Sequence, residues 1–190
     1  MVPVSSEARV DQILELLKTA GQSAYFGEPV TQLEHALQCA QLARDAGSDE
    51  EMIIAALLHD IGHLLEGEGL RDDAVGVIDH DAVGARYLRE RGFSDRVAQL
   101  VSGHVAAKRY LTLTNPSYFA RLSRASVATL QLQGGPMTAG EAAVFGRDPL
   151  FEQKLRLRSW DETGKLVGWA VAPLSSYRDL LVAHLNRALS

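Results

Sequence analysis

An apolar segment over residues 53–65 carries the adjacent pair His59-Asp60 and, four residues after the histidine, His63. The apolar residues around these side chains predict a buried helix, on which His59 and His63 share one face. Burying an ionisable side chain is costly unless the group is paired or bound to a metal. The segment therefore predicts both a helical core and polar partners that other parts of the chain supply.

Helix-start and helix-stop residues recur along the chain, whereas the alternation typical of strands is nearly absent. The capping box Thr31 to Glu34 opens one helix, and Ser48 to Glu51 opens the helix that carries His59. At 190 residues the chain is long enough to bury a full core. We expect one compact all-α domain over residues 1–190, with a short strand or extended loop at 165–170. The expected helices cover residues 9–20, 31–46, 48–66, 81–91, 95–111, 117–133, 138–145, 149–158 and 175–189.

Composition narrows the class of protein. The net charge of -5 does not favour nucleic acid or an anionic membrane surface as a partner. No apolar stretch of about 18 residues is available to span a bilayer, and the N-terminal segment lacks the apolar region of a signal peptide. The single cysteine, Cys39, suits a reducing compartment and is interpreted as a small core residue. We expect a cytoplasmic monomer or small homo-oligomer.

Three histidines on other predicted helices, His35, His80 and His104, are available to reach the His59-Asp60 pair, as metal ligands do in helical bundles. Any one of them alone is more simply a hydrogen-bonded core or surface residue. Five of the six histidines fall between residues 35 and 104, and separate core or surface roles explain this clustering poorly. Imidazole and carboxylate ligands suit iron, manganese or zinc. We therefore predict a metal site. The sixth histidine is His184, near the C-terminus, and it is interpreted as a surface residue.

Polar residues near these histidines are candidates for holding a substrate. Lys108 follows His104 by one helical turn, and a lysine beside cationic metals is unfavourable unless an anion lies between them, which suggests an anchor for phosphate or phosphonate. A solvated lysine is the alternative. The spacing of Ser126, Thr129 and Gln133 places them along one helix as possible donors to such an anion, although exposed hydroxyls on helices are common.

A loop lies between the first two predicted helices, because Gly27 and Pro29 mark a turn there. Loops beside a rigid site often act as lids. The phenol of Tyr25 and the carboxylate of Glu28 could reach a metal from this loop, which by its pattern alone is an ordinary helix connection.

His35 followed by His59-Asp60 resembles the HD-domain superfamily of helical metalloproteins, which includes many phosphohydrolases, and His80 and His104 add the pattern of its dinuclear members. Nearly the whole chain resembles one subgroup, the PhnZ-type di-iron oxygenases of phosphonate catabolism. The His-Asp pair is common to the superfamily, whereas the 103–110 block and the Tyr25/Glu28 loop are more specific. The segments that carry the resemblance are 25–28, 32–35, 59–63, 103–110, 133–137 and 160–162.

The resemblance implies a pair of iron ions in the Fe(II)/Fe(III) state, bridged by Asp60. Tyr25 would occupy an open iron position in the empty enzyme and leave when substrate arrives, with Glu28 moving alongside it. The implied iron ligands are His35, His59, Asp60, His80, His104 and Asp161. The implied substrate contacts are His63, Lys108, Ser126, Thr129, Gln133 and Arg158.

The implied reaction uses O2 to cleave the carbon–phosphorus bond of an organophosphonate, releasing phosphate and a carboxylic acid. Relatives act on 1-hydroxy-2-aminoethylphosphonate, giving glycine, or on its N-trimethyl analogue, giving glycine betaine. An aromatic wall at Phe26 would favour the trimethylammonium compound, towards which we lean slightly. Hydrogen-bond acceptors at Glu28, Gln32 or Glu34 would instead favour the primary ammonium. Two alternatives stay open. One is a dinuclear phosphohydrolase acting on phosphate esters, and the other is an HD domain without catalytic activity that serves in binding or signalling.

Overall fold

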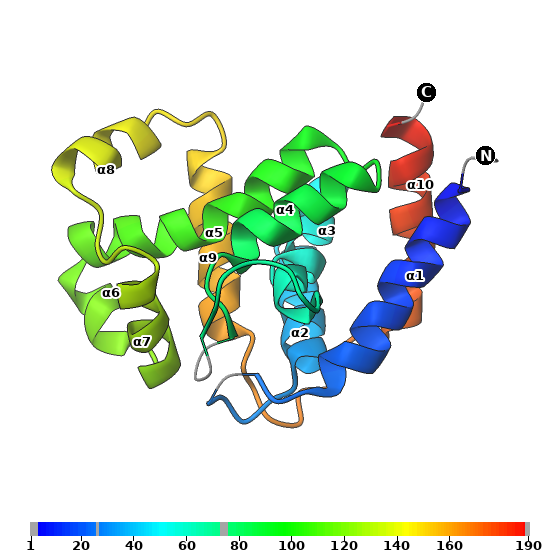
Figure 1. Cartoon of the computed structure of the whole chain (residues 1–190), viewed down its shortest axis with the longest axis horizontal. Helices are drawn as coiled ribbons and strands as arrows, with labels where there is room; N and C mark the ends of the chain where they lie inside the picture. The colour runs from blue at the N-terminus through cyan, green and yellow to red at the C-terminus, as the bar shows by residue number, and fades with distance from the viewer. Residues whose placement is uncertain (1–3, 26, 73–75, 189–190) are drawn as a thin grey trace.

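A computed structural model describes residues 4–25, 27–72 and 76–188 of the chain. Within them the regular secondary structure is helical apart from one short two-stranded ribbon, which confirms the predicted all-α class (Figure 1). Phe26, the predicted aromatic wall, lies outside the described residues. The α-helices are α1 (Ser6–Thr19), α2 (Gln32–Asp45), α3 (Glu50–Leu58), α4 (His80–Glu90), α5 (Asp95–Thr114), α6 (Pro116–Arg121), α7 (Arg124–Leu132), α8 (Ala139–Phe145), α9 (Phe151–Thr163) and α10 (Arg178–Ala188).

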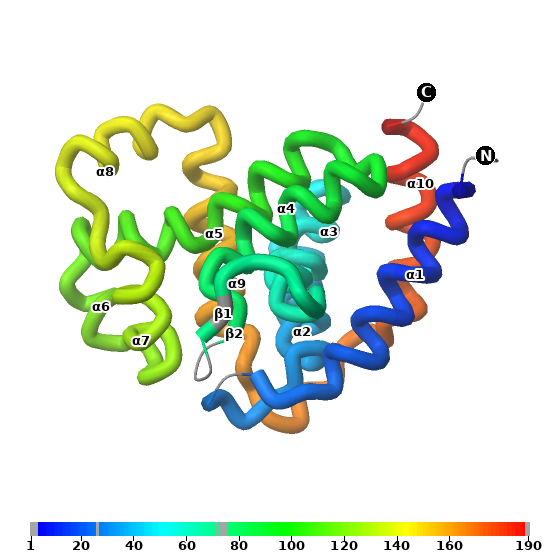
Figure 2. Tube along the Cα trace, in the orientation of Figure 1, coloured from blue at the N-terminus to red at the C-terminus, as the bar shows by residue number. Residues whose placement is uncertain are grey.

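Short elements connect these helices. Three 3₁₀ turns are described: η1 (Ala20–Gln22), η2 (Ile61–Leu64) and η3 (Leu174–Tyr177). Two strands that the sequence did not predict, β1 (Arg71–Asp72) and β2 (Gly76–Val77), form a small antiparallel ribbon before α4 (Figure 2). Residues 165–170 form a loop, one of the two predicted alternatives.

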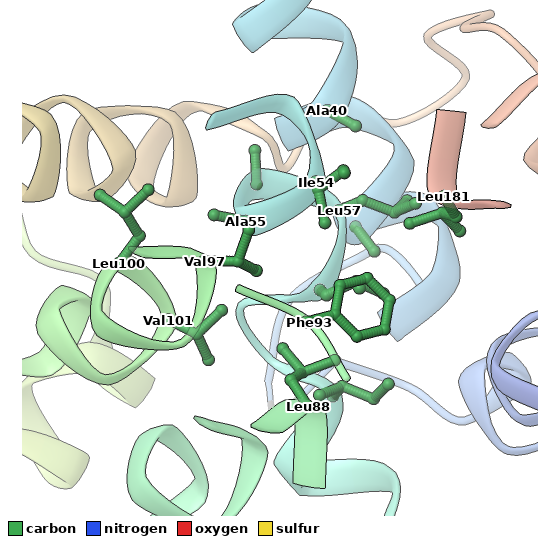
Figure 3. Packing of buried hydrophobic residues seen from close by; sticks show 14 of the residues in the cluster. Ala40, Ile54, Ala55, Leu57, Leu88, Phe93, Val97, Leu100, Val101 and Leu181 are labelled. Atoms are coloured by element: carbon green, nitrogen blue, oxygen red, sulfur yellow. The ribbon is translucent and has the colours of Figure 1, made fainter. Parts of the chain in front are cut away.

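Helix α3 forms the centre of the core. Its residues from Ile54 to Leu58 are all buried, as expected for a helix that is apolar on every side. Helices α2, α5, α9 and α10 pack against it. Figure 3 shows Ile54, Ala55 and Leu57 of this helix meeting Val97 and Leu181 from its neighbours. The metal-competent pair His59-Asp60 follows directly after α3 and is therefore positioned by a helix buried in the core.

Capping residues start several helices where the sequence predicts them. Thr31 and Glu34 form the expected capping box, and the side chains of Ser94 and Thr138 each accept a hydrogen bond from the third residue of their helix. Helix α3 is capped by Asp49, one residue later than the predicted signal from Ser48 to Glu51. Helix ends were predicted less well. The predicted helix over 117–133 is two helices, because Leu122 is extended and Ser123 caps α7. Helix α9 runs to Thr163, beyond the predicted end at residue 158.

The predicted continuation of the third helix to residue 66 is wrong. Helix α3 ends at Leu58, and the chain turns through His59 and Asp60 into η2, which contains His63. His59 and His63 therefore do not share the face of one helix. This turn packs closely against the start of α4, which brings Asp60 beside His80.

The prediction for His184 is also wrong. This histidine of α10 is 4% exposed, stacks against Phe93 and accepts a hydrogen bond at Nε2 from the backbone N–H of Ser94 at 3.1 Å. Its partners lie 90 residues away along the chain, so helical periodicity alone could not indicate its burial.

Helix α5 joins the two halves of the molecule seen in Figure 1. Its first half lies in the bundle beside α3 and α4, and its second half contacts α6 and α8. A smaller apolar cluster around Ala107, Met137 and Phe145 holds that second half. His104 and Lys108 stand near the junction, where α7 comes close enough for Lys108 to contact Thr129.

Candidate metal centre

Six predicted ligands come together from four helices and the turn after α3. His35 belongs to α2, His80 begins α4, His104 lies in the middle of α5, and Asp161 lies in the last turn of α9. His59 and Asp60 lie in the turn that follows α3. None of the six is more than 8% exposed. Groups of this kind are rarely buried together unless they bind a cation or one another.

Asp60 lies between two pairs of histidines. Its Oδ2 atom is 3.6 Å from Nε2 of His35 and 3.3 Å from Nε2 of His59. Its Oδ1 atom is 3.3 Å from Nε2 of His80 and 3.5 Å from Nε2 of His104. Each carboxylate oxygen thus faces one pair of rings. This arrangement can bridge two metal ions, one on each side.

Asp161 completes the first of these two groups. Its Oδ1 atom lies 3.5 Å from Nε2 of His35 and 4.0 Å from Nε2 of His59. The first group therefore offers two imidazoles and two carboxylate oxygens, and the second offers two imidazoles and one. The second group has room in its donor set for an oxygen from a substrate or from water.

Backbone carbonyls fix the orientation of all four rings. In each, Nδ1 lies 2.6–3.1 Å from a main-chain oxygen and therefore carries the donated proton, which leaves Nε2 as the atom that faces the centre. Nε2 of His80 and His104 are only 2.9 Å apart, and those of His35 and His59 are 3.2 Å apart. Lone pairs at such distances repel unless a cation or a proton lies between them. The carbonyl partners belong to Gly164, Ala56, Val77 and Val101.

The charges of the site favour cations. Burial lowers the pKa of His59, but the carboxylates of Asp60 and Asp161 outweigh this effect and raise it to about 9. Burial raises the pKa of Asp60, but His59, His104 and His80 hold it well below its usual range. A bound metal takes the place of such a proton. The donor set of imidazole nitrogens and carboxylate oxygens therefore fits a pair of first-row transition metals.

Cys39 is a core residue, as predicted. Its Sγ atom lies 3.8 Å from the ring nitrogens of His35 and 3.5 Å from the carbonyl oxygen of Trp160. Burial raises the pKa of the thiol well above its usual value. The thiol also lies close enough to His35 and His59 to share a metal with them, whereas the nitrogen and oxygen donors already make up the predicted ligand set.

A cavity borders the second ligand group. Measured as the space open to the centre of a water molecule, it is about 40 Å³, enough for only a few waters. Its lining brings together most of the predicted site residues and adds one lysine that the sequence did not single out. The lining polar residues are Tyr25, Glu28, Asp60, His63, His80, His104, Lys108, Ser126, Thr129, Gln133, Arg158, Asp161 and Lys165.

Lys108 is a buried cation on this wall. It is 3% exposed, and its Nζ donates to Oγ1 of Thr129 at 2.8 Å. The alternative of a solvated lysine is therefore wrong. Burial lowers the pKa of Lys108 to about 7, and the nearby Arg158 guanidinium adds to this effect. An anion that enters the cavity would stabilise the charged form of this buried lysine.

The other predicted substrate contacts differ in how many interactions they already make with other protein groups. Ser126 lines the cavity from α7, and Nε2 of Gln133 donates to the carbonyl of Ile78 at 3.2 Å. His63 stacks on His80 with ring centroids 3.9 Å apart, and burial lowers its pKa well below the usual value, so it is a neutral ring.

Arg158 is held on the protein side of the cavity. Its guanidinium pairs with Asp161 and Glu162, and its Nε donates to the hydroxyl of Tyr118 at 2.8 Å. Sequence reasoning missed Tyr118 and Glu162. Through these contacts Arg158 orients the carboxylate of Asp161, besides adding positive charge to the cavity wall.

Tyr25 covers the first ligand group. Its ring stacks on His35 with centroids 4.1 Å apart, and its hydroxyl lies 3.5 Å from Oδ1 of Asp161. Burial raises the pKa of this phenol well above 10.0, so the hydroxyl is protonated. The loop is closed by a bridge between Ala24 and Thr31 and turns at Gly27, whose φ is 71°.

Gly62 allows the close packing that brings Asp60 and His80 together. A Cβ atom at this position would lie 2.0 Å from the carbonyl oxygen of His80 and 2.9 Å from the backbone nitrogen of Gly84. We predict that Gly62→Ala lowers the free energy of unfolding by about 2–3 kcal/mol, because backbone atoms must move. It should also lower the metal content, since His80 moves with them.

Thermal unfolding and elemental analysis of the purified variant measure both effects. The matched control is Gly140→Ala in the exposed helix α8, where an added Cβ meets only one atom at 4.0 Å. This control should change stability by less than about 1 kcal/mol. An unchanged metal content in Gly62→Ala would contradict the proposed role of the turn.

A model of the HD domain matches residues 33–137 of the chain, a range that contains five of the six predicted metal ligands. The chain belongs to the HD-domain family. Asp161 lies outside the matched range and depends on helix α9. The HD-domain region therefore supplies both histidine pairs and the shared Asp60, and the C-terminal part of the chain completes the site.

Three relatives of this HD-domain chain are similar over most of its length. An uncharacterized protein of Acanthamoeba polyphaga mimivirus is 39% identical over 94% of this chain and 83% of its own. The 1-hydroxy-2-(trimethylamino)ethylphosphonate dioxygenase (glycine-betaine-forming) of Leisingera caerulea is 45% identical over 81% and 82%. The hydroxymethylphosphonate dioxygenase of Gimesia maris is 44% identical over 89% and 84%. These names confirm the predicted oxygenase and the predicted branch of the HD-domain family.

No helix in the described part of the chain has both the length and the apolar character needed to cross a membrane.

Proposed function

We propose that this HD-domain protein holds two iron ions in the Fe(II)/Fe(III) state and uses O2 to cleave the carbon–phosphorus bond of a small 1-hydroxyphosphonate. The observation that carries the proposal is the Asp60 carboxylate, shared by two histidine pairs beside a cavity that contains the buried Lys108. The substrates that the sequence predicts are 1-hydroxy-2-(trimethylammonio)ethylphosphonate and 1-hydroxy-2-aminoethylphosphonate, with glycine betaine or glycine as products. The name of the Gimesia maris relative adds hydroxymethylphosphonate as a third candidate.

The proposed ligands are His35, His59, Asp60 and Asp161 for one ion and His80, His104 and Asp60 for the other. When bound, the ions would supply a site that activates O2 and open positions that orient the substrate, while the four electrons that reduce O2 would come from the substrate. Conversion of a 1-hydroxyphosphonate and one O2 into a carboxylate and phosphate balances in atoms, so no further reductant is consumed. The predicted cytoplasmic location, the single domain and the predicted oligomeric state stay predictions.

The chain's own residues would bind and orient the phosphonate. Lys108 offers a buried ammonium, and Ser126 and Thr129 offer hydroxyls on the same wall. Charge-assisted hydrogen bonds from such donors are shorter and stronger than neutral ones. Thr129 Oγ1 already accepts from Lys108 at 2.8 Å, so the two groups are positioned together before any ligand enters.

Tyr25 would control access to the site. The cavity holds only a few waters as it stands, so a phosphonate with its carbon chain needs one of the lining groups to move. Tyr25 belongs to a loop and not to a helix, and its hydroxyl has a long 3.5 Å contact with Asp161. Its withdrawal would open the cavity at the least cost in core packing, while Glu28 keeps its ion pair with Lys165.

An assay with and without O2 tests the proposal. Iron-loaded protein incubated with each of the three 1-hydroxyphosphonates should release phosphate and consume O2 in a ratio of one to one. Phosphate release that continues under argon would instead indicate the phosphohydrolase, and turnover of phosphate esters with manganese would support that alternative further. Protein that binds no metal would indicate a domain without catalytic activity.

A further inference from the structure

Glu28 and Lys165 form an ion pair at the wall of the substrate cavity. The carboxylate oxygen and Nζ lie 3.2 Å apart, and the two side chains are 13% and 12% exposed. Glu28 belongs to the loop that carries Tyr25, and Lys165 follows Gly164, the residue that caps the end of α9. Nζ of Lys165 also lies 5.5 Å from the centre of the Tyr25 ring. The pair thus connects the loop to the C-terminal side of the site.

The charged groups of the cavity form three sets: the groups on the metal side with Arg158, the cation Lys108, and the pair of Glu28 with Lys165. Asp60 and Asp161 face the histidines, and Arg158 is neutralised by Asp161 and Glu162. Lys108 has no carboxylate within ion-pair distance among the residues that the structure describes, so it is the cation available to a phosphonate. Glu28 is then the described cavity carboxylate that is free of the proposed metal ligand set.

A substrate with a positively charged group on its second carbon needs a carboxylate or an aromatic wall to receive that charge. In this cavity the carboxylate is Glu28, and the ammonium of Lys165 already occupies it. Taking Glu28 from Lys165 would leave that lysine without its partner, close to Lys108 and Arg158. Separating a largely buried ion pair in this way is unfavourable. A substrate without a cationic group avoids this cost.

We infer that the Glu28–Lys165 ion pair makes the site selective for 1-hydroxyphosphonates that carry no positive charge on the second carbon, with hydroxymethylphosphonate as the smallest example. Lys165 is then a specificity-determining residue that competes with a substrate ammonium for Glu28. The inference rests on the proposed phosphonate oxygenase. It differs from the predicted preference for the trimethylammonium compound, which rested on Phe26.

The test compares kcat/KM for hydroxymethylphosphonate and for the 2-amino and 2-trimethylammonio forms of 1-hydroxyethylphosphonate. The wild-type protein should prefer hydroxymethylphosphonate by about tenfold or more. Lys165→Met releases Glu28 and should shift the ratio towards the 2-amino compound by about tenfold or more. Lys165→Arg keeps the charge and should keep the wild-type preference. The matched control is Lys154→Met, which removes a buried lysine paired with Asp148 away from the cavity and should leave the ratio unchanged.

Two results would overturn the inference: a wild-type preference for either cationic substrate, or a ratio in Lys165→Met within twofold of wild type. The wild-type comparison stands even if Lys165→Met does not fold. Failure of the proposed function looks different, because the wild-type protein would then turn over none of the three phosphonates in the presence of O2.

Discussion

Asp60→Asn is expected to abolish turnover and to lower the iron content from two ions per chain to one or none. The Asp60 carboxylate places one oxygen beside His35 and His59 and the other beside His80 and His104. Asparagine keeps the shape but replaces one oxygen with an N–H donor and removes the negative charge. Loss of a shared ligand should reduce activity by about 10³-fold, which corresponds to about 4 kcal/mol of activation free energy.

Elemental analysis and the O2-dependent phosphate assay measure this effect. The matched control is Asp148→Asn, which removes a carboxylate that pairs with Lys154 outside the cavity. This control should keep two ions per chain and most of the activity. If Asp60→Asn retained both ions, the shared-ligand arrangement would be wrong, even if the variant were inactive.

Lys108→Met is expected to lower kcat/KM by about 10²-fold, because it removes a charged hydrogen bond to the phosphonate. It should also change the pH dependence. The pKa of Lys108 is about 7 in the protein without bound ligand or metal. Above that pH a growing fraction of the protein molecules carries a neutral Lys108, which must gain a proton before an anion binds well. Wild-type kcat/KM should therefore fall as the pH rises above 7, and this decline should be absent in Lys108→Met.

The variant Lys108→Arg distinguishes the effect of the positive charge from the effect of its loss at high pH. Arginine stays protonated throughout the range, so this variant should retain part of the affinity for phosphonate and lose the decline above pH 7. The ionisation of the substrate is the same for all three proteins and cancels in the comparison. A decline that persists unchanged in Lys108→Met would assign it to another group.

Stability provides a second measurement on the same variants. The pKa of Lys108 is lower in the folded state than in the unfolded chain, so the unfolded chain binds more protons between about pH 7 and pH 10. The contribution of Lys108 to the free energy of unfolding therefore increases as the pH rises through that window, and it is lowest below pH 7. Without phosphonate, Lys108→Met should therefore be more stable than wild type at pH 6, by about 1–3 kcal/mol. Denaturant titration at pH 6 and pH 9 checks the sign.

The helical fold could be predicted from local rules because its caps are local. Thr31, Ser94 and Thr138 each bond to a residue three positions later, so their signals stand in the sequence itself. The early end of α3 could not be predicted this way. It accompanies the close approach of Gly62 to the backbone of His80, a contact between two segments that helical periodicity does not encode.

The candidate site was predicted in the same uneven way. Helix spacing and one adjacent His-Asp pair indicated five of the six proposed ligands, and the structure brings them together. Asp161 was available only through the family resemblance, because its helix was predicted to end at residue 158. Lys165 was missed, since a single lysine after a glycine has no distinctive pattern and its partner Glu28 is 137 residues away.

The position of both His104 and Lys108 on α5 has a consequence for how new substrate preferences can arise. Four residues along an α-helix span about 6 Å, so the separation between the proposed second iron and the anion anchor is set by the covalent backbone. Loop residues such as Glu28 are free of that constraint. In the proposed function the reacting end of the substrate would be held by a rigid element, whereas a loop that tolerates change would lie beside its other end. Mutations in the loop can then exchange one phosphonate for another without moving the atoms that react.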